Sequence, residues 1–182
     1  MPVIRLLLWV LGGALLGGVV HLASVLVLPR LATQDAYSRL SSITRTNTIT
    51  PLPAPTPENA LMPFMDPAFA TAVCRYDLSS GPLKFSVPIS PAYTSVSFYT
   101  RSEVAYYAIN DRSAGRRVIE LELMTREQRN NLPGDEEITA ADRLIVESPT
   151  TTGLVLVKAL APEFGLLPTA RNVLTTARCQ QQ

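Results

Sequence analysis

The first thirty residues are far more apolar than the rest of the chain. Residues 6–28 contain no charged side chain, and this run ends at Pro29 and Arg30. A helix rises ~1.5 Å per residue, so a run of this length crosses a hydrocarbon core that is ~30 Å thick. The pattern therefore predicts a single transmembrane anchor over residues 1–30.

A cleaved secretory signal is the alternative interpretation of this segment. The apolar region of such a signal usually has only about 7–15 residues and ends at a small-x-small cleavage site. Here Ala23 is preceded two residues earlier by His21, and Ala32 is preceded in the same way by Arg30. Neither alanine completes a good cleavage site, so an uncleaved span is favoured.

Small residues recur at a spacing of four within this span. Gly13 and Gly17 form a G-x-x-x-G pair, and Ala14 and Gly18 repeat the spacing beside it. Such spacing allows two helices to approach closely in lipid, where no hydrophobic force drives them together. The pattern is typical of a helix contact with a second copy or another membrane protein, although glycine is also frequent in membrane spans generally.

Residues 31–60 are predicted to be a juxtamembrane segment followed by a Pro-rich linker. Between residues 44 and 59 proline stands at every second position, at Pro51, Pro53, Pro55 and Pro57. Alternating proline excludes a helix and favours an extended polyproline-type spacer. A ligand for an SH3-type domain is the alternative, but no basic residue flanks the run.

Residues 61–182 change to short segments in which apolar and polar side chains alternate. In the clearest segment Ile119 and Leu121 face one side, while Glu120 and Glu122 face the other. About seven such segments are separated by Pro, Gly, Asn or Asp: residues 71–78, 83–87, 95–99, 104–109, 118–124, 144–147 and 154–160. Their number and spacing predict a mainly β soluble domain, an antiparallel β-sandwich or an open barrel.

One or two short helices are expected within this domain. Thr125 and Gln128 have the spacing of a capping box, which predicts a helix near residues 125–131. Pro168 suits a first helical turn and precedes an apolar stripe, which predicts a second helix over residues 168–178.

Two cysteines lie at opposite ends of the β-rich domain. Cys74 is in the inward-facing set of the first predicted strand, and Cys179 follows the second predicted helix. The absence of a C-x-x-C motif disfavours a thioredoxin-like pair or a zinc knuckle. The arrangement favours a disulfide between Cys74 and Cys179, and two unrelated thiols are the alternative.

The two signals for membrane orientation disagree. A disulfide requires an oxidising compartment and therefore favours a periplasmic domain. By contrast, Arg30, Arg39 and Arg45 follow the span, whereas Arg5 and the α-amino group precede it, and this excess of about one charge mildly favours a cytoplasmic domain. The charge difference is small, so the cysteines decide for the periplasm.

The charges and the single histidine narrow the function classes. Of 16 Lys and Arg residues all but Arg5 lie in residues 30–182, where 15 Asp and Glu balance the remaining 15. No basic face is implied, which argues against nucleic acid as a partner. His21 lies inside the span, so the domain cannot supply a histidine-dependent triad or a His-ligated metal site. No catalytic residue, metal site or cofactor is predicted.

Two sets of side chains are candidates for a ligand site. Four tyrosines of the predicted strands could line a groove between the sheets: Tyr93, Tyr99, Tyr106 and Tyr107. Half-buried tyrosines are also ordinary residues of a sheet. Glu120 and Glu122 share a strand face and could act as a carboxylate pair for acid–base chemistry or calcium, but a solvated face is the ordinary explanation for such a pair.

Several strand-like motifs resemble those of a known family. They are Asp66-Pro67, the segment AVCRYDL at 72–78, Gly81-Pro82, and TSVSFY at 94–99. Residues 60–165 resemble small membrane-anchored bacterial proteins related to domain-of-unknown-function family 1254. The resemblance implies a β-rich fold, an envelope location and a companion domain that is carried by a separate protein. It implies no activity and no site residues.

Together these features predict a single-pass protein of the bacterial inner (cytoplasmic) membrane whose β-rich domain lies in the periplasm. The expected function is a non-enzymatic binding or interaction module. Its partners would be the lipid bilayer and a second membrane or periplasmic protein, or a second copy of the chain. The alternative is an envelope enzyme or small-ligand carrier that uses a groove between the sheets.

Overall fold

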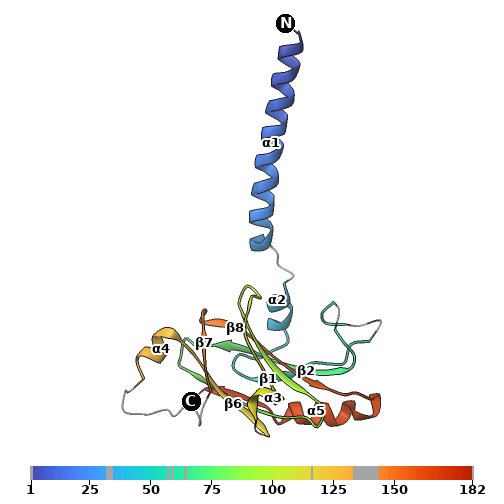
Figure 1. Cartoon of the computed structure of the whole chain (residues 1–182), viewed down its shortest axis with the longest axis vertical. Helices are drawn as coiled ribbons and strands as arrows, with labels where there is room; N and C mark the ends of the chain where they lie inside the picture. The colour runs from blue at the N-terminus through green and yellow to red at the C-terminus, as the bar shows by residue number, and fades with distance from the viewer. Residues whose placement is uncertain are drawn as a thin grey trace. The chain divides into compact units, whose positions relative to one another are not determined.

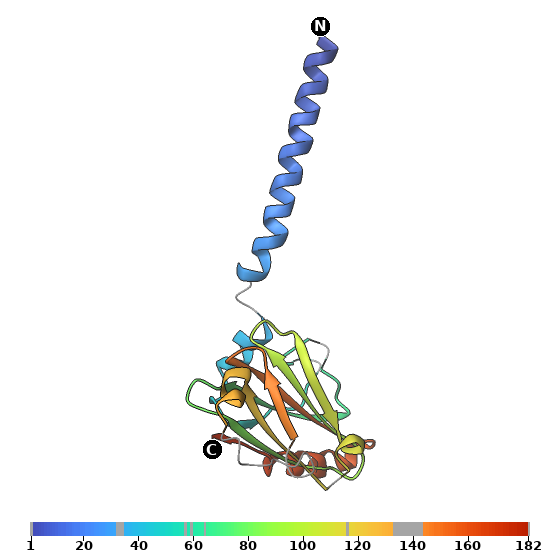
Figure 2. The ribbon, with the colours of Figure 1, turned by 60° about the vertical axis from the view of Figure 1, so that its left-hand side comes forward.

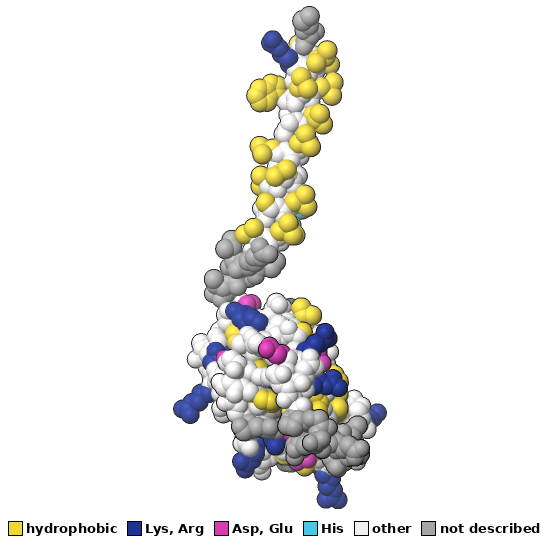
Figure 3. All heavy atoms as spheres, turned by 90° about the vertical axis from the view of Figure 1, so that its left-hand side faces the viewer, with side chains coloured by type: hydrophobic (Ala, Val, Ile, Leu, Met, Phe, Trp, Pro, Cys, Tyr) yellow, Lys and Arg dark blue, Asp and Glu magenta, His cyan; other side chains and the backbone are white. Residues whose placement is uncertain are grey.

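The chain forms two compact units, Met1–Asp35 and Ala36–Gln182. The computed structural model describes residues 2–31, 35–56, 58, 60–63, 65–115, 117–132 and 144–181. The first unit is helix α1 (Pro2–Leu31), along which apolar side chains are exposed to the outside (Figure 3). Its segment Pro2–Leu28 is long and apolar enough to cross a membrane, with a mean hydropathy of 2.2. The predicted long apolar helix is confirmed.

The second unit is a sandwich of two β-sheets (Figure 1, Figure 2). The five-stranded sheet has the order β1-β2-β8-β4-β5, and the four-stranded sheet has the order β7-β6-β3-β9. The strands are β1 (Ile49–Pro51), β2 (Phe69–Asp77), β3 (Leu83–Pro88), β4 (Thr94–Thr100), β5 (Ala105–Asn110), β6 (Val118–Thr125), β7 (Leu144–Ser148), β8 (Thr152–Leu160) and β9 (Arg178–Gln181). Among these strands only β6 and β7 pair in parallel. The predicted sandwich is therefore confirmed, with one parallel pair.

The core lies between the two sheets because their strands alternate buried and accessible residues. Every second residue of β4 is buried, from Thr94 to Thr100, and β3 follows the same pattern. Phe85 of the four-stranded sheet meets Phe98 of the five-stranded sheet edge to face, with ring centroids 5.8 Å apart. Removal of such apolar surface from water holds the two layers together.

Short helices lie around the sandwich. They are α2 (Ala36–Ser41), α3 (Asp111–Ala114), α4 (Arg126–Asn130), the 3-10 helix η1 (Phe164–Leu166) and α5 (Leu167–Thr175). Helix α5 contacts strands of both sheets and buries Ala170 and Leu174 (Figure 1). The predicted helix near 125–131 is confirmed as α4, whose capping box joins Thr125 and Gln128. The second helix ends at Thr175, earlier than predicted, because the chain then enters β9.

The segment predicted to be a Pro-rich spacer packs on the five-stranded sheet. Strand β1 pairs with β2, and the Leu52 amide donates to the Thr71 carbonyl at 2.8 Å. Leu40 and Leu52 are buried against Val73 and other apolar residues on the outer face of this sheet. Proline is tolerated because β1 is an edge strand. A free spacer over residues 44–59 is therefore wrong for the described part of that segment.

Candidate functional site

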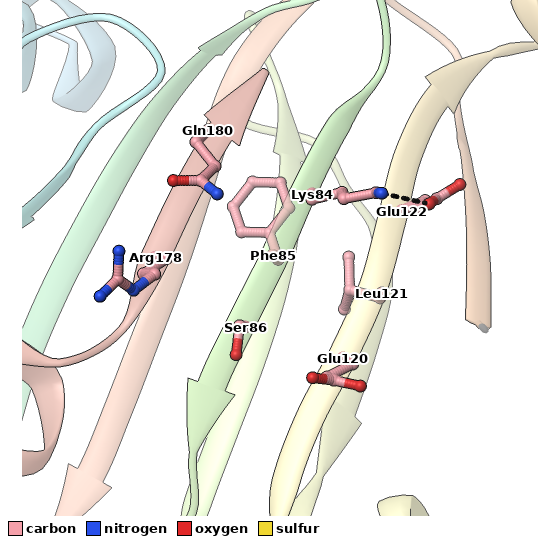
Figure 4. Close-up of a pocket in the computed structure, with 8 residues that line it drawn as sticks. All are labelled: Lys84, Phe85, Ser86, Glu120, Leu121, Glu122, Arg178 and Gln180. Carbon is pink, nitrogen blue, oxygen red and sulfur yellow. Dashed lines mark ion pairs between the residues drawn. The ribbon is translucent and has the colours of Figure 1, made fainter. Parts of the chain in front are cut away.

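The outer face of the four-stranded sheet carries two rows of polar side chains (Figure 4). One row is Gln180, Lys84 and Glu122, and the other is Arg178, Ser86 and Glu120, each taken in the order β9, β3, β6. The strand register sets these rows, since partners across neighbouring strands project from the same face. Both rows line a hollow of about 270 Å³.

The first row contains a closed ion pair. Lys84 Nζ lies 3.7 Å from Glu122 Oε1, and the Lys84 side chain is 45% exposed whereas that of Glu122 is 7% exposed. Burying a charge costs free energy unless an opposite charge accompanies it. Lys84 therefore allows a carboxylate to stand in the wall of the hollow.

The second row keeps its charges apart. Arg178 and Glu120 are both exposed and flank Ser86, which is half-buried on the strand between them. Neither charged group forms an ion pair with another residue in the described part of the chain. In Figure 4 their charged ends lie on either side of Ser86 and do not meet.

The structure thus places Glu120 and Glu122 on one face, as their alternation predicts, and adds two cations beside them. A carboxylate pair alone would attract a metal ion, but Lys84 and Arg178 oppose a cation there. Within the described residues no group of three or more His, Cys, Asp and Glu side chains is placed to hold a metal ion. The cations were missed from sequence because strand order brings them together.

A second hollow, of about 620 Å³, opens beside Tyr106. It is lined by Tyr106, Thr125, Arg126, Glu127, Glu147, Ser148, Pro149, Thr150 and Thr151. At its rim Arg126 Nε donates to Glu147 Oε1 at 2.8 Å, and this bond lowers the pKa of Glu147. Burial of Tyr106 raises the pKa of its hydroxyl far above the ordinary value.

The wall of this hollow is a hydroxyl network whose protons all have acceptors within the protein. Tyr106 donates to the Tyr76 hydroxyl at 3.2 Å, and Tyr76 donates to the Tyr99 carbonyl at 3.3 Å. Ser148 donates to the Thr150 carbonyl at 2.6 Å, and Thr150 Oγ1 donates to the Thr152 carbonyl at 2.9 Å. Because each hydroxyl has only one proton, this network offers a ligand acceptors but no spare donor.

The four tyrosines predicted to line one groove do not share a face. Tyr106 and Tyr107 both pack on Phe98 in the core, with ring centroids 6.1 Å and 5.9 Å from it. Tyr99 lies on the opposite face of the sheet, in the cluster around Leu154. Tyr93 lies just before β4 begins, where its carbonyl accepts from the Leu160 amide. Only Tyr106 reaches a hollow described above, and Tyr76, which sequence reasoning missed, is its partner.

Cys74 and Cys179 form a disulfide that joins the two sheets. Cys74 is on β2 of one sheet and Cys179 is on β9 of the other, and their Cα atoms are 6.5 Å apart. Both residues are buried. Cys179 was expected at the end of a helix, but its place on a strand lets it point between the sheets.

The remaining candidate surfaces are small. The four glycines of α1 would accept an added Cβ with no other atom within 4 Å, so the contact predicted for Gly13, Ala14, Gly17 and Gly18 stays a prediction. On the sandwich, Phe164 is 84% exposed, and Leu166, which is 43% exposed, lines an apolar hollow of about 50 Å³.

A family model described as "Protein of unknown function (DUF1254)" matches residues 46–181. The chain belongs to this family. The DUF1254 match runs from the residue before Asn47 to the end of β9, and it therefore includes both hollows and the disulfide. It confirms the resemblance seen in the sequence. No curated protein matches the chain.

Two solved structures are similar to this DUF1254 protein. The VPA0106 protein from Vibrio parahaemolyticus has a TM-score of 0.59 at 12% identity, over 80% of this chain and 32% of that one. An uncharacterized protein from Burkholderia cenocepacia has a TM-score of 0.48 at 13% identity, over 66% of this chain and 33% of that one. The first likeness shows the fold, and the chain spans about a third of the length of either protein.

Proposed function

We propose that this DUF1254 protein is a membrane-anchored binding module of the bacterial envelope. Helix α1 would hold it in the inner membrane, and the sandwich would be presented to the periplasm. The hollowed outer face of the four-stranded sheet would be its binding surface. The observation that carries this proposal is the array of opposite charges from three strands around one hollow.

Two features support the membrane anchor and the compartment. Segment Pro2–Leu28 has the length and hydropathy of a membrane span, and its side chains are exposed rather than buried within the protein. The disulfide between Cys74 and Cys179 is stable only where thiols are oxidised, as in the periplasm. Because the membrane keeps an anchored domain close to other envelope components, even a weak binding site on the domain can be occupied.

The partners that we propose follow from the same two units. The bilayer surrounds α1, and the small residues at 13, 14, 17 and 18 suit a helix contact with a second membrane protein or a second copy. The charged hollow suits a partner that offers groups of both signs, since it holds Lys84 and Arg178 next to Glu120 and Glu122. Such complementarity gives specificity more than raw affinity.

The second candidate is an envelope enzyme or small-ligand carrier that uses the hollow beside Tyr106. Its larger volume of about 620 Å³ favours this alternative. The closed hydroxyl network favours the module, because its four hydroxyls have no spare proton and a ligand there would need donors from the rest of the lining, such as Arg126, Thr125 or Thr151. Covalent labelling at either hollow separates the two candidates.

The test is photo-crosslinking of the full chain in living cells. A photoreactive residue in place of Ser86 should form a discrete adduct, and a matched probe in place of the exposed Ser113 should not. Substituting Glu120→Gln and Arg178→Gln together should abolish the Ser86 adduct while thermal unfolding stays unchanged. If the Ser86 probe forms no adduct, or if the Ser86 and Ser113 probes form identical adducts, the charged face is not the binding surface. An adduct only from a probe at Thr151 would favour the carrier.

A further inference from the structure

The two rows of the charged hollow differ in one respect that points to a ligand. Lys84 and Glu122 satisfy each other at 3.7 Å, whereas Arg178 and Glu120 are held apart by the strand between them. The hydroxyl of Ser86 lies between the two charges and can donate or accept a hydrogen bond. The second row therefore offers a cation, a neutral polar group and an anion in a line.

The strand spacing and the reach of the two side chains limit the size of what fits this line. Neighbouring strands lie about 4.8 Å apart, so Arg178 and Glu120 project from points roughly 9.5 Å apart. A charge-assisted hydrogen bond takes up about 2.8 Å at each end. Both side chains are long and flexible, so their charged ends can approach each other more closely than the strands do, and a ligand whose two charges are only a few bonds apart, as in a small amino acid or an ethanolamine phosphate, can reach both.

Simple ions are disfavoured by the rest of the array. An anion at Arg178 would also feel the carboxylates of Glu120 and Glu122, and a cation at Glu120 would feel Lys84 and Arg178. A molecule that carries both charges in the right order gains at both ends and leaves no charge unmatched.

We propose that Arg178, Ser86 and Glu120 form a site for a small zwitterion. The guanidinium binds its carboxylate or phosphate, the Glu120 carboxylate binds its ammonium, and the Ser86 hydroxyl contacts the atoms between. This inference rests on the proposed function, because it names the ligand class of the same face. The zwitterion can be a free amino acid or the headgroup of an ethanolamine lipid.

The experiment is calorimetric titration of the full chain in detergent micelles. The probes are β-alanine, phosphoethanolamine, and the half-molecules propionate and ethylamine. We expect one or both zwitterions to bind at least about tenfold more tightly than either half-molecule. Stronger binding of phosphoethanolamine would assign the lipid headgroup, and stronger binding of β-alanine would assign a free amino acid.

Two charge-removing variants and two controls make the result specific. Glu120→Gln and Arg178→Gln should each weaken zwitterion binding by roughly tenfold, whereas the exposed Glu163→Gln and Arg171→Gln should leave it unchanged. Equal binding of zwitterions and half-molecules, or zwitterion binding that survives both site variants, would overturn the inference. If the Ser86 crosslink forms but no zwitterion binds, the ligand class is wrong and the binding module stands; if both fail, both proposals fall.

Discussion

The side chain of Asn47 hydrogen-bonds the backbone of Asp77 in both directions. Its Oδ1 accepts from the Asp77 amide at 2.8 Å, and its Nδ2 donates to the Asp77 carbonyl at 3.0 Å. The Asn47 amide itself donates to the Arg75 carbonyl at 2.8 Å. Asn47 thereby continues the edge of the five-stranded sheet where β1 has not yet begun, and it ties residues 44–52 to β2.

Replacing Asn47 should release this tie. Asn47 has a φ of 55°, a left-handed conformation that asparagine tolerates better than alanine. Asn47→Ala should therefore lower the free energy of unfolding by about 2–3 kcal/mol, through two lost hydrogen bonds and backbone strain. Asn47→Gly removes only the bonds and should cost less. Urea unfolding measures both, and an effect no larger than that of the exposed Thr48→Ala would contradict this role.

The same segment shows what the sequence could not predict. Pro51 to Pro57 favoured an extended spacer, but the chain from Ile49 to Pro51 is strand β1, and Leu52 and Leu40 have a partner surface on the outer face of the sheet. The local sequence pattern predicts the backbone conformation of a segment. Where the segment packs depends on residues that lie far along the chain, here Val73 and Leu154. The apolar alternation of β3, β4 and β6, which is local, was predicted correctly.

Gly153 cannot be replaced by a residue with a side chain. A Cβ at this position would overlap both the Tyr99 carbonyl oxygen and the Tyr76 hydroxyl. Gly153→Ala should therefore cost about 3 kcal/mol or more, since β8 lies in the middle of its sheet and cannot shift. Gly165→Ala is the matched control, because its Cβ would meet nothing within 4 Å, and it should change stability by less than about 0.5 kcal/mol. Equal melting temperatures for the two variants would refute the close approach.

The disulfide should contribute strongly because it closes a long loop. Its cysteines are 105 residues apart, and a loop of about this length corresponds to up to ~4.7 kcal/mol in the chain-entropy model. We expect the double variant Cys74→Ala, Cys179→Ala to lose about 2–5 kcal/mol. Reductant should destabilise the native protein similarly and leave the double variant unaffected.

Thiol labelling of membranes from cells checks the compartment at the same time. Under denaturing conditions neither Cys74 nor Cys179 should react until reductant is added, and both should react afterwards. Two free thiols in freshly extracted protein would argue against a periplasmic domain, whatever the stability of the bond in vitro.

The tyrosines and the charged hollow show why the candidate sites were only partly predictable. Strict alternation places Tyr106 and Tyr107 on opposite faces of β5, but the register to β4 shifts between Phe98 and Tyr99. Tyr106 is the extra residue of a β-bulge, so both rings reach Phe98. Alternation correctly placed Glu120 with Glu122, yet the order β6-β3-β9 that adds Arg178 depends on contacts distant in sequence.

The hydroxyl network should make the protein sensitive to alkaline pH. Burial raises the pKa of Tyr106 above the ordinary value of 10.0, so the folded state retains a proton that the unfolded chain releases. The contribution of Tyr106 to stability is therefore complete below about pH 10 and declines as the pH rises further. Tyr106→Phe should lose some stability at neutral pH, about 1 kcal/mol for one hydrogen bond, but should decline less steeply above pH 10.

Urea midpoints measured from neutral to strongly alkaline pH test this directly. The two stability curves should converge as the pH rises, because the variant has no Tyr106 proton to release on unfolding. Parallel curves would mean that the Tyr106 hydroxyl ionises equally easily in both states. The hydrogen bond from Tyr106 to Tyr76 would then be too weak or too exposed to water to hold the network together. In that case the Tyr106 hydroxyl could donate a hydrogen bond to a ligand in the hollow.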